Sequence, residues 1–339
     1  MQDFSKLKDY FRSKYTWDPQ KIQISPLSGG FSNLTYLLNT PAGKYALRRP
    51  PVGNTVSKAH DMGREFKVLE SLKNAGYTKI PNPVFFEENE EILGAPFFLM
   101  EFVEGTVLRN KVPSGVIFNE ETARKLSENS ILTLLQLHQL DLEKTGLIQL
   151  GKPQGYVLRQ VEGWIERYFK AKTDEIPEME KAALWIKENI PQRENTGFIH
   201  NDFKYDNLVL NTSQLDQIKA VLDWEMATVG DPLMDLGTTL AYWAEENDSD
   251  ILKQFNLTHL PGNMTREEVI DFYGQHSELD LKDILFYYVF GLFKVAVIAQ
   301  QIYKRFVQGY TQDQRFGALI YVVKAASQKA EKSIKTGKI

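Results

Sequence analysis

The chain has 339 residues, of which 42% are hydrophobic and 25% are charged, a balance typical of globular proteins. Its formal net charge of −4 gives no indication of a protein that binds nucleic acid or an anionic membrane. Cysteine is absent, which excludes a disulfide framework and a thiolate metal site.

The length allows two lobes, and we predict an N-terminal nucleotide-binding lobe over residues 1–103 and a helical C-terminal lobe over 104–339. The first residues lack the apolar core of a signal peptide. The apolar run 284–293 falls short of the roughly 20 residues that a membrane span needs, and Lys294 interrupts it. We therefore expect a cytoplasmic protein without a membrane partner.

Helical spacing of apolar residues predicts a short amphipathic helix over residues 3–14. A glycine pair then lies between two strand-like runs, where backbone amides are able to approach phosphate closely. The segment is either a plain hairpin turn or a loop that covers a nucleotide. Its residues are Ser28, Gly29, Gly30, Phe31, Ser32 and Asn33.

Two adjacent arginines, Arg48 and Arg49, end the next strand-like run. An arginine binds phosphate bidentately without losing its charge, and the sequence leaves open which of the two meets the nucleotide. Glu65 lies on a predicted helix and is placed to pair with that cation, although an ordinary surface charge pair is an equal alternative.

Residues 80–86 and 96–105 are predicted to close a small N-terminal sheet. The second run ends at Glu101, Phe102 and Val103, where a hinge would present backbone groups to a purine.

From Glu120 the apolar residues take helical spacing, and His138 lies on this helix. A lone histidine on an apolar helix face is more often a packed core residue than a catalytic base, and we expect the core role. Residues 155–168 form a second predicted helix that carries Arg159, Trp164 and Tyr168. These side chains either belong to the core or line a substrate cleft.

The stretch 198–210 places Asp202, Lys204 and Asn207 between two short apolar runs that are typical of buried strands. A predicted hairpin follows, and its second strand ends at Asp223. Each residue alone would be an ordinary turn residue. Two clusters in this order make that alternative weak. Asp235 precedes a helical run and is expected to cap or brace the loop. The remaining chain is predicted to be helical, with one long apolar stretch, 284–302, inside the larger lobe and a frayed basic tail from Lys329.

The pattern His-x-Asp-x-Lys-x-x-Asn resembles the catalytic loop of protein kinases and of the aminoglycoside phosphotransferase-like kinases. This resemblance implies an α+β, two-lobed kinase fold with a small antiparallel sheet lobe and a larger helical lobe. It also implies ATP and Mg²⁺ as cofactors. Asp202 would accept the proton of an attacking hydroxyl, Lys204 would stabilise the transferred phosphoryl group, and Asn207 and Asp223 would hold magnesium.

Further segments are similar to the kinase-like module of acyl-CoA dehydrogenase family members ten and eleven and its stand-alone bacterial relatives. They are 29–36, 47–51, 159–168 and 293–305. This likeness suggests a small-molecule hydroxyl as the acceptor, and a hydroxyacyl-CoA in particular. The alternatives are an aminoglycoside-type antibiotic kinase and a nucleotide-binding module without turnover. The sequence does not decide the oligomeric state.

Overall fold

A computed structural model describes residues 3–27, 33–51, 62–311 and 313–339, which form two compact units. The N-terminal unit comprises residues 1–104 together with 219–227, and the C-terminal unit comprises 105–218 and 228–339. The predicted functional division of the chain at residue 103 stays a prediction. Most of the predicted glycine-pair loop, namely Ser28, Gly29, Gly30, Phe31 and Ser32, lies outside the described residues.

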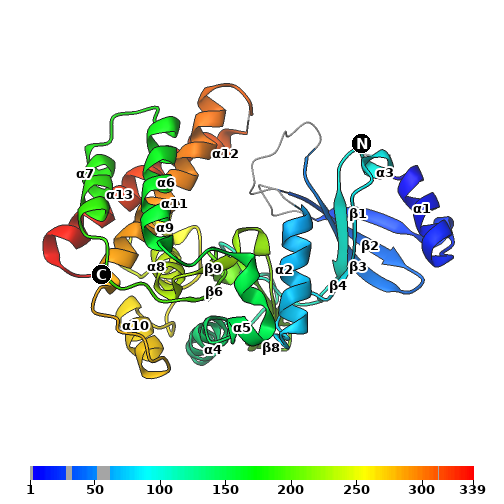
Figure 1. The fold of residues 1–339 in the computed structure, drawn as a ribbon, viewed down its shortest axis with the longest axis horizontal. Coiled ribbons are helices and arrows are strands. Elements are labelled where there is room, and N and C mark those ends of the chain that lie inside the picture. The colour runs from blue at the N-terminus through cyan, green and yellow to red at the C-terminus, as the bar shows by residue number, and fades with distance from the viewer. Residues whose placement is uncertain (1–2, 28–32, 52–61, 312) are drawn as a thin grey trace. The chain divides into compact units, whose positions relative to one another are not determined.

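The described part of the N-terminal unit is built on a five-stranded antiparallel sheet with the strand order β1-β2-β3-β5-β4 (Figure 1). Its elements are α1 (Ser5–Tyr15), β1 (Gln23–Leu27), β2 (Leu34–Thr40), β3 (Gly43–Arg49), α2 (Met62–Asn74), β4 (Pro83–Glu87), α3 (Glu90–Leu93) and β5 (Phe97–Glu101).

Helices cover this sheet because each has one apolar face. In α1, Leu7 and Phe11 are one helical turn apart, and both are fully buried against the core side chains of β2, β3 and β5. Helix α2 packs on β4 and β5. The predicted N-terminal helix and the two predicted closing strands are therefore present in the structure.

The C-terminal unit is mostly helical, with two small two-stranded sheets among its described residues. Its elements are α4 (Glu120–His138), α5 (Leu142–Thr145), α6 (Tyr156–Ala171), α7 (Pro177–Glu188), β6 (Gly197–Ile199), β7 (Leu208–Asn211), β8 (Gln214–Val221), β9 (Thr228–Gly230), α8 (Pro232–Tyr242), α9 (Asp250–Lys253), α10 (Arg266–Gln275), α11 (Ile284–Val307), α12 (Gln314–Gly317) and α13 (Leu319–Thr336).

Helix α11 is the central helix of this unit and packs against α8, α13, α6 and α7. It has 24 residues and contains the whole apolar stretch 284–302 that was predicted to lie inside this lobe, and its length and hydropathy alone would let it cross a membrane. However, 78% of its most apolar window is buried inside the protein. This burial is typical of the core helix of a globular unit.

Short strands hold the polar stretch 200–207 at both ends. Strand β6 precedes it and pairs antiparallel with β9, and β7 follows it and pairs with β8. The predicted hairpin is therefore confirmed. The chain passes into the N-terminal unit within β8 and returns after Ala227.

The expectation of a frayed tail from Lys329 is wrong. Helix α13 continues to Thr336, and the side chains of Ala330 and Ser333 are buried. Lys329 itself forms an ion pair with Asp248. Small residues spaced for one helix face anchor this segment, a signal that its basic composition obscured.

Candidate functional site

Arg48, near the end of β3, lies among three carboxylates in the N-terminal unit. Its Nη1 is 3.2 Å from Glu65 Oε1. Its Nη2 is 2.5 Å from Asp223 Oδ1 and 3.1 Å from Glu225 Oε2. The segment 219–227 thus carries two acidic groups to an arginine that is far away in the sequence. Glu225 had no predicted role, and only its place two residues after Asp223 indicated one.

This carboxylate cluster carries more negative than positive charge. Glu65 is almost completely buried, and its burial raises the pKa of its carboxyl to about 7 in spite of the attraction of Arg48. Asn33 donates from Nδ2 to Glu225 Oε2 at 2.8 Å. Among the described residues, Asn33 Oδ1 and Glu65 Oε2 are buried without a hydrogen-bond partner. A cationic or hydrogen-bonding ligand would therefore be favoured here.

Arg49 points elsewhere, because successive side chains on a strand face opposite sides of the sheet. It donates to two backbone carbonyls, from Nε to Pro50 at 3.0 Å and from Nη1 to Leu93 at 2.7 Å. Its side chain is fully buried. Arg48 therefore belongs to the carboxylate cluster, whereas Arg49 bonds to backbone carbonyls; which of the two meets the nucleotide stays a prediction.

The predicted hinge, Glu101 to Val103, follows the end of β5. The N–H of Glu101 donates to Asn82 O at 2.8 Å, and that of Phe102 donates to Lys44 O at 3.2 Å. No backbone hydrogen bond of Val103 occurs within the described ranges. The carbonyl of Phe102 likewise accepts no backbone hydrogen bond among the described residues, and the contact of this segment with a purine stays a prediction.

In the C-terminal unit, Asp202, Lys204 and Asn207 form one hydrogen-bonded group. Lys204 Nζ lies 3.0 Å from Asp202 Oδ2. Asn207 Nδ2 donates to the same oxygen at 3.0 Å and to the backbone carbonyl of Asp202 at 2.8 Å. Burial alone would lower the pKa of Lys204, but the negative charge of Asp202 raises it above its usual value. The lysine therefore remains charged beside the carboxylate.

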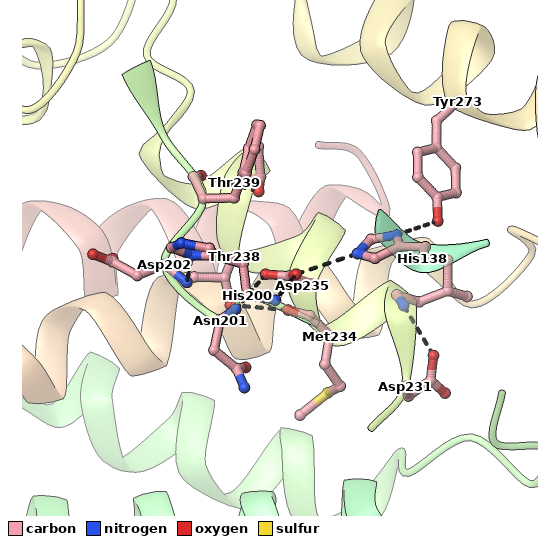
Figure 2. Close-up of polar contacts among 12 residues, drawn as sticks. His138, His200, Asn201, Asp202, Asp231, Met234, Asp235, Thr238, Thr239 and Tyr273 are labelled. Carbon is pink, nitrogen blue, oxygen red and sulfur yellow. Dashed lines mark hydrogen bonds and ion pairs between the residues drawn. The ribbon is translucent and has the colours of Figure 1, made fainter. Parts of the chain in front are cut away.

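Asp235 braces this loop from α8, as predicted. Its two carboxylate oxygens accept the backbone N–H groups of His200 at 2.6 Å and Asn201 at 2.8 Å (Figure 2). The N-cap role belongs instead to Asp231, which accepts from Leu233 N at 2.9 Å.

His138 is buried in the core, as expected, and it extends the brace. Its Nε2 lies 3.2 Å from Asp235 Oδ2, and its Nδ1 lies 2.8 Å from the Tyr273 hydroxyl, so that Asp235 stands between the imidazole and the loop (Figure 2). The two partners of His138 come from α8 and α10, which the local pattern around residue 138 does not indicate.

The candidate substrate residues of α6 have different surroundings. Arg159 donates to the carbonyls of Lys152 and Gln154, in the segment just before its own helix. Tyr168 is fully buried with its ring 5.8 Å from that of Phe293. Trp164 is also buried, and Lys294 Nζ lies 5.8 Å from its ring centroid. Of the three, Trp164 contacts a residue that binds the loop before Asp202, since Lys294 donates to Asn201 O.

The predicted magnesium ligands are compatible with that ion. Within the described part of the chain, no group of three His, Cys, Asp or Glu residues is arranged to hold a metal ion. Magnesium commonly binds through one or two carboxylates together with phosphates and water, so a dense protein cage is not required. The carboxylate of Asp223 is one-third exposed, and it lies in a cluster with excess negative charge. Asn207 donates from Nδ2 to Asp202, so its amide oxygen would be the atom that binds the ion.

Known proteins share this architecture. A putative aminoglycoside phosphotransferase from Ralstonia eutropha matches with a TM-score of 0.78 and 25% identity, covering 98% of this chain and 99% of that chain. The streptomycin–ATP ternary complex of APH(2")-IIa matches with a TM-score of 0.57 and 16% identity, over 97% of this chain and 98% of that chain, which shows the fold alone. The fold is therefore that of the kinase-like phosphotransferases, as the sequence predicted.

The sequence comparisons define the family. The model of the phosphotransferase enzyme family matches residues 23–268, and the chain belongs to this family. Acyl-CoA dehydrogenase family member 11 from Rattus norvegicus is 34% identical over 292 residues, which are 85% of this chain. The match spans only 37% of that relative's length. The predicted family resemblance is confirmed.

Proposed function

We propose that the protein is a small-molecule kinase that uses ATP and Mg²⁺ to transfer the γ-phosphate to a hydroxyl group. The observation that carries the proposal is the presence of both sets of polar groups that such a reaction needs. They are the Arg48 carboxylate cluster and the Asp202–Lys204–Asn207 group. Membership of the phosphotransferase enzyme family supports it.

The roles follow from the chemistry of phosphoryl transfer. Asp202 orients the acceptor hydroxyl and takes its proton while the hydroxyl oxygen bonds to the γ-phosphorus. The bond from that phosphorus to the β–γ bridging oxygen breaks, and ADP leaves with the electron pair. Lys204 stabilises the charge on the transferred group, and Arg48 holds the α- and β-phosphates. Asn207 and Asp223 would hold Mg²⁺, which neutralises the charge of the phosphates.

For the acceptor we propose a hydroxyacyl-CoA, on the strength of the similarity to acyl-CoA dehydrogenase family member 11. An aminoglycoside acceptor is disfavoured, because a polycation needs an acidic cleft. The side chains around Trp164 are instead the cations Arg167 and Lys294, at 4.8 and 5.8 Å from its ring.

The test is ATP consumption in the presence of hydroxyacyl-CoAs, sugars, amino alcohols and aminoglycosides, with the phosphorylated product identified by mass spectrometry. Running the panel with GTP decides the nucleotide. We expect turnover with a hydroxyacyl-CoA and its loss in Asp202→Asn and Asp223→Ala. Asp250→Asn changes a fully exposed carboxylate and serves as the control. ATP binding without consumption for any acceptor would favour a binding module.

A further inference from the structure

Lys294 is a buried cation in the middle of the apolar helix α11, with only 2% of its surface exposed. Its Nζ donates to the backbone carbonyl of Asn201 at 2.7 Å. Longer contacts of 3.4 Å reach Asn201 Oδ1 and Thr238 Oγ1. A buried lysine is costly unless its donors are satisfied, and the nearest acceptor here belongs to the residue immediately before Asp202.

Lys294 reaches the Asn201 carbonyl because helices α11 and α8 approach each other closely. A Cβ on Gly291 would lie 2.2 Å from Gly237 O, and a Cβ on Gly237 would lie 2.2 Å from Tyr287 O, so α11 and α8 meet backbone to backbone. Lys294 follows Gly291 by three residues and therefore lies on the same face of α11. The glycine contact thus brings its amine beside Thr238 and the catalytic loop.

The peptide that Lys294 holds has an unusual conformation. Asn201 has a φ of 67°, in the left-handed region that few residues other than glycine adopt, asparagine more often than most. Three helices fix this residue: α8 through Asp235 to its N–H, α6 through the Tyr156 hydroxyl to its side chain, and α11 through Lys294 to its carbonyl. The direction in which the chain enters Asp202 depends on these contacts.

We propose that Lys294 is a positioning residue for phosphoryl transfer, which fixes the Asn201 carbonyl and thereby the direction of the Asp202 carboxylate. The inference rests on the proposed function, because it assigns Asp202 to the acceptor hydroxyl. The amine acts through the loop and does not contact the nucleotide or the acceptor.

The charges around Lys294 indicate that the pH dependence of kcat is a suitable readout for its role. Burial lowers the pKa of its ammonium to about 8, while Asp235 on α8 and Asp202 on the loop counteract this effect. Lys204 on the loop and Arg167 on α6 lower the pKa further. The ammonium therefore loses its proton as the pH rises through about 8, and its hold on the carbonyl weakens.

The experiment compares Lys294→Met and Lys294→Gln with Gln300→Met on the same helix. Gln300 is also buried, and it donates to Ala171 O and Thr173 Oγ1 away from the catalytic loop. We expect kcat to fall about a hundredfold in both Lys294 variants, the scale of a small misplacement of a catalytic group, with ATP affinity within about twofold of the wild type. The control should keep the wild-type kcat.

Two further readouts separate positioning from general damage. The wild-type kcat should decline above pH 8, and this alkaline limb should be absent from Lys294→Gln, which has no group to titrate. Hydrogen exchange should accelerate at the amides of residues 200–203 in Lys294→Met and stay unchanged in α13.

An unaltered kcat, pH profile and loop exchange in both Lys294 variants would overturn the proposal, and so would an equal kcat loss in Gln300→Met. If the wild type phosphorylates no acceptor, the proposed function fails by itself. The exchange measurement still decides whether Lys294 holds the loop: faster exchange confined to 200–203 supports the hold, and unchanged exchange refutes it.

Discussion

The two neighbouring arginines of β3 form a matched pair for mutation. Arg48 forms ion pairs with three carboxylates, whereas the hydrogen bonds of Arg49 within the described residues go to backbone carbonyls. We expect Arg48→Lys to weaken ATP binding about tenfold or more, because an ammonium cannot reproduce the planar fork of donors. Arg49→Lys should lower the melting temperature while it leaves ATP affinity unchanged. Calorimetric titration checks both, and equal losses of affinity would contradict the assignment of Arg48.

Glu65 gives the protein a pH-dependent stability. Its folded-state pKa, about 7, lies above the ordinary value of 4.5 for a glutamate, because its carboxyl is buried. The protonated form is therefore favoured by folding, and its stabilisation is complete below pH 4.5 and lost as the pH rises through 7. Relative to Glu65→Gln, we expect the unfolding free energy of the wild type to fall by about 3 kcal/mol over this range. Denaturant titration at several pH values measures it, with the exposed Glu90→Gln as control. Parallel pH curves for wild type and Glu65→Gln would contradict this.

Asp235 is fully buried and binds two backbone N–H groups and His138. In Asp235→Asn one carboxylate oxygen becomes an NH₂ group that faces a donor. We expect a loss of about 3 kcal/mol in unfolding free energy, together with a large loss of kcat. The exposed Asp250→Asn should change stability by less than about 0.5 kcal/mol. Wild-type stability in Asp235→Asn would show that the brace is dispensable.

Single residues differ in how far the sequence could predict them. The sequence predicted the polar group Asp202, Lys204, Asn207 and Asp223 because phosphoryl transfer constrains the order and spacing of these residues. Their convergence on one triphosphate stays a prediction. The partner of Lys294 was not readable, since a lysine inside an apolar run indicates a buried cation but not which carbonyl it reaches. That contact depends on how two helices cross.

At the scale of elements, α8 and α11 cross at close range because Gly237 and Gly291 have no side chains at the contact. We expect Gly291→Ala to destabilise the protein by about 3 kcal/mol or more, because its Cβ would meet Gly237 O at 2.2 Å. Gly163→Ala, inside α6, should stabilise it by about 0.5–1 kcal/mol, since its Cβ would meet only Arg167 Nη1 at 3.4 Å. Thermal unfolding measures both changes in stability, which should have opposite signs. A neutral Gly291→Ala would mean that the helices separate readily.

Local periodicity accounts for what was predicted correctly among the elements. The spacing of Leu7 and Phe11 identified α1, and a turn-forming segment between apolar runs identified the β7–β8 hairpin. The apolar stretch 284–302 identified most of α11, which ends five residues later at Val307. Lys294 lies inside this helix because tertiary contacts satisfy its charge.

At the scale of the whole molecule, nucleotide binding should be measurable as stability. A ligand at about a hundred times its Kd adds about 2.7 kcal/mol. For a protein of this size, that corresponds to a rise in melting temperature of roughly 4 °C. We expect ATP with Mg²⁺ to produce this shift and ATP with EDTA to produce a smaller one. In Asp223→Ala the difference between the two should vanish. A metal-dependent shift that persists in this variant would place the ion elsewhere.

The N-terminal unit is discontinuous in the sequence. Val221 N donates to Lys79 O at 2.9 Å, and the Trp224 and Tyr77 rings lie 6.1 Å apart, so a segment from beyond residue 200 completes this unit. A gene fragment that stops at codon 104 would encode the sheet without Asp223 and Glu225. Of the three ion pairs of Arg48, it would keep the one with Glu65. No single cut through the gene separates the two units. Rearrangements that graft this module onto other proteins must carry both coding segments together.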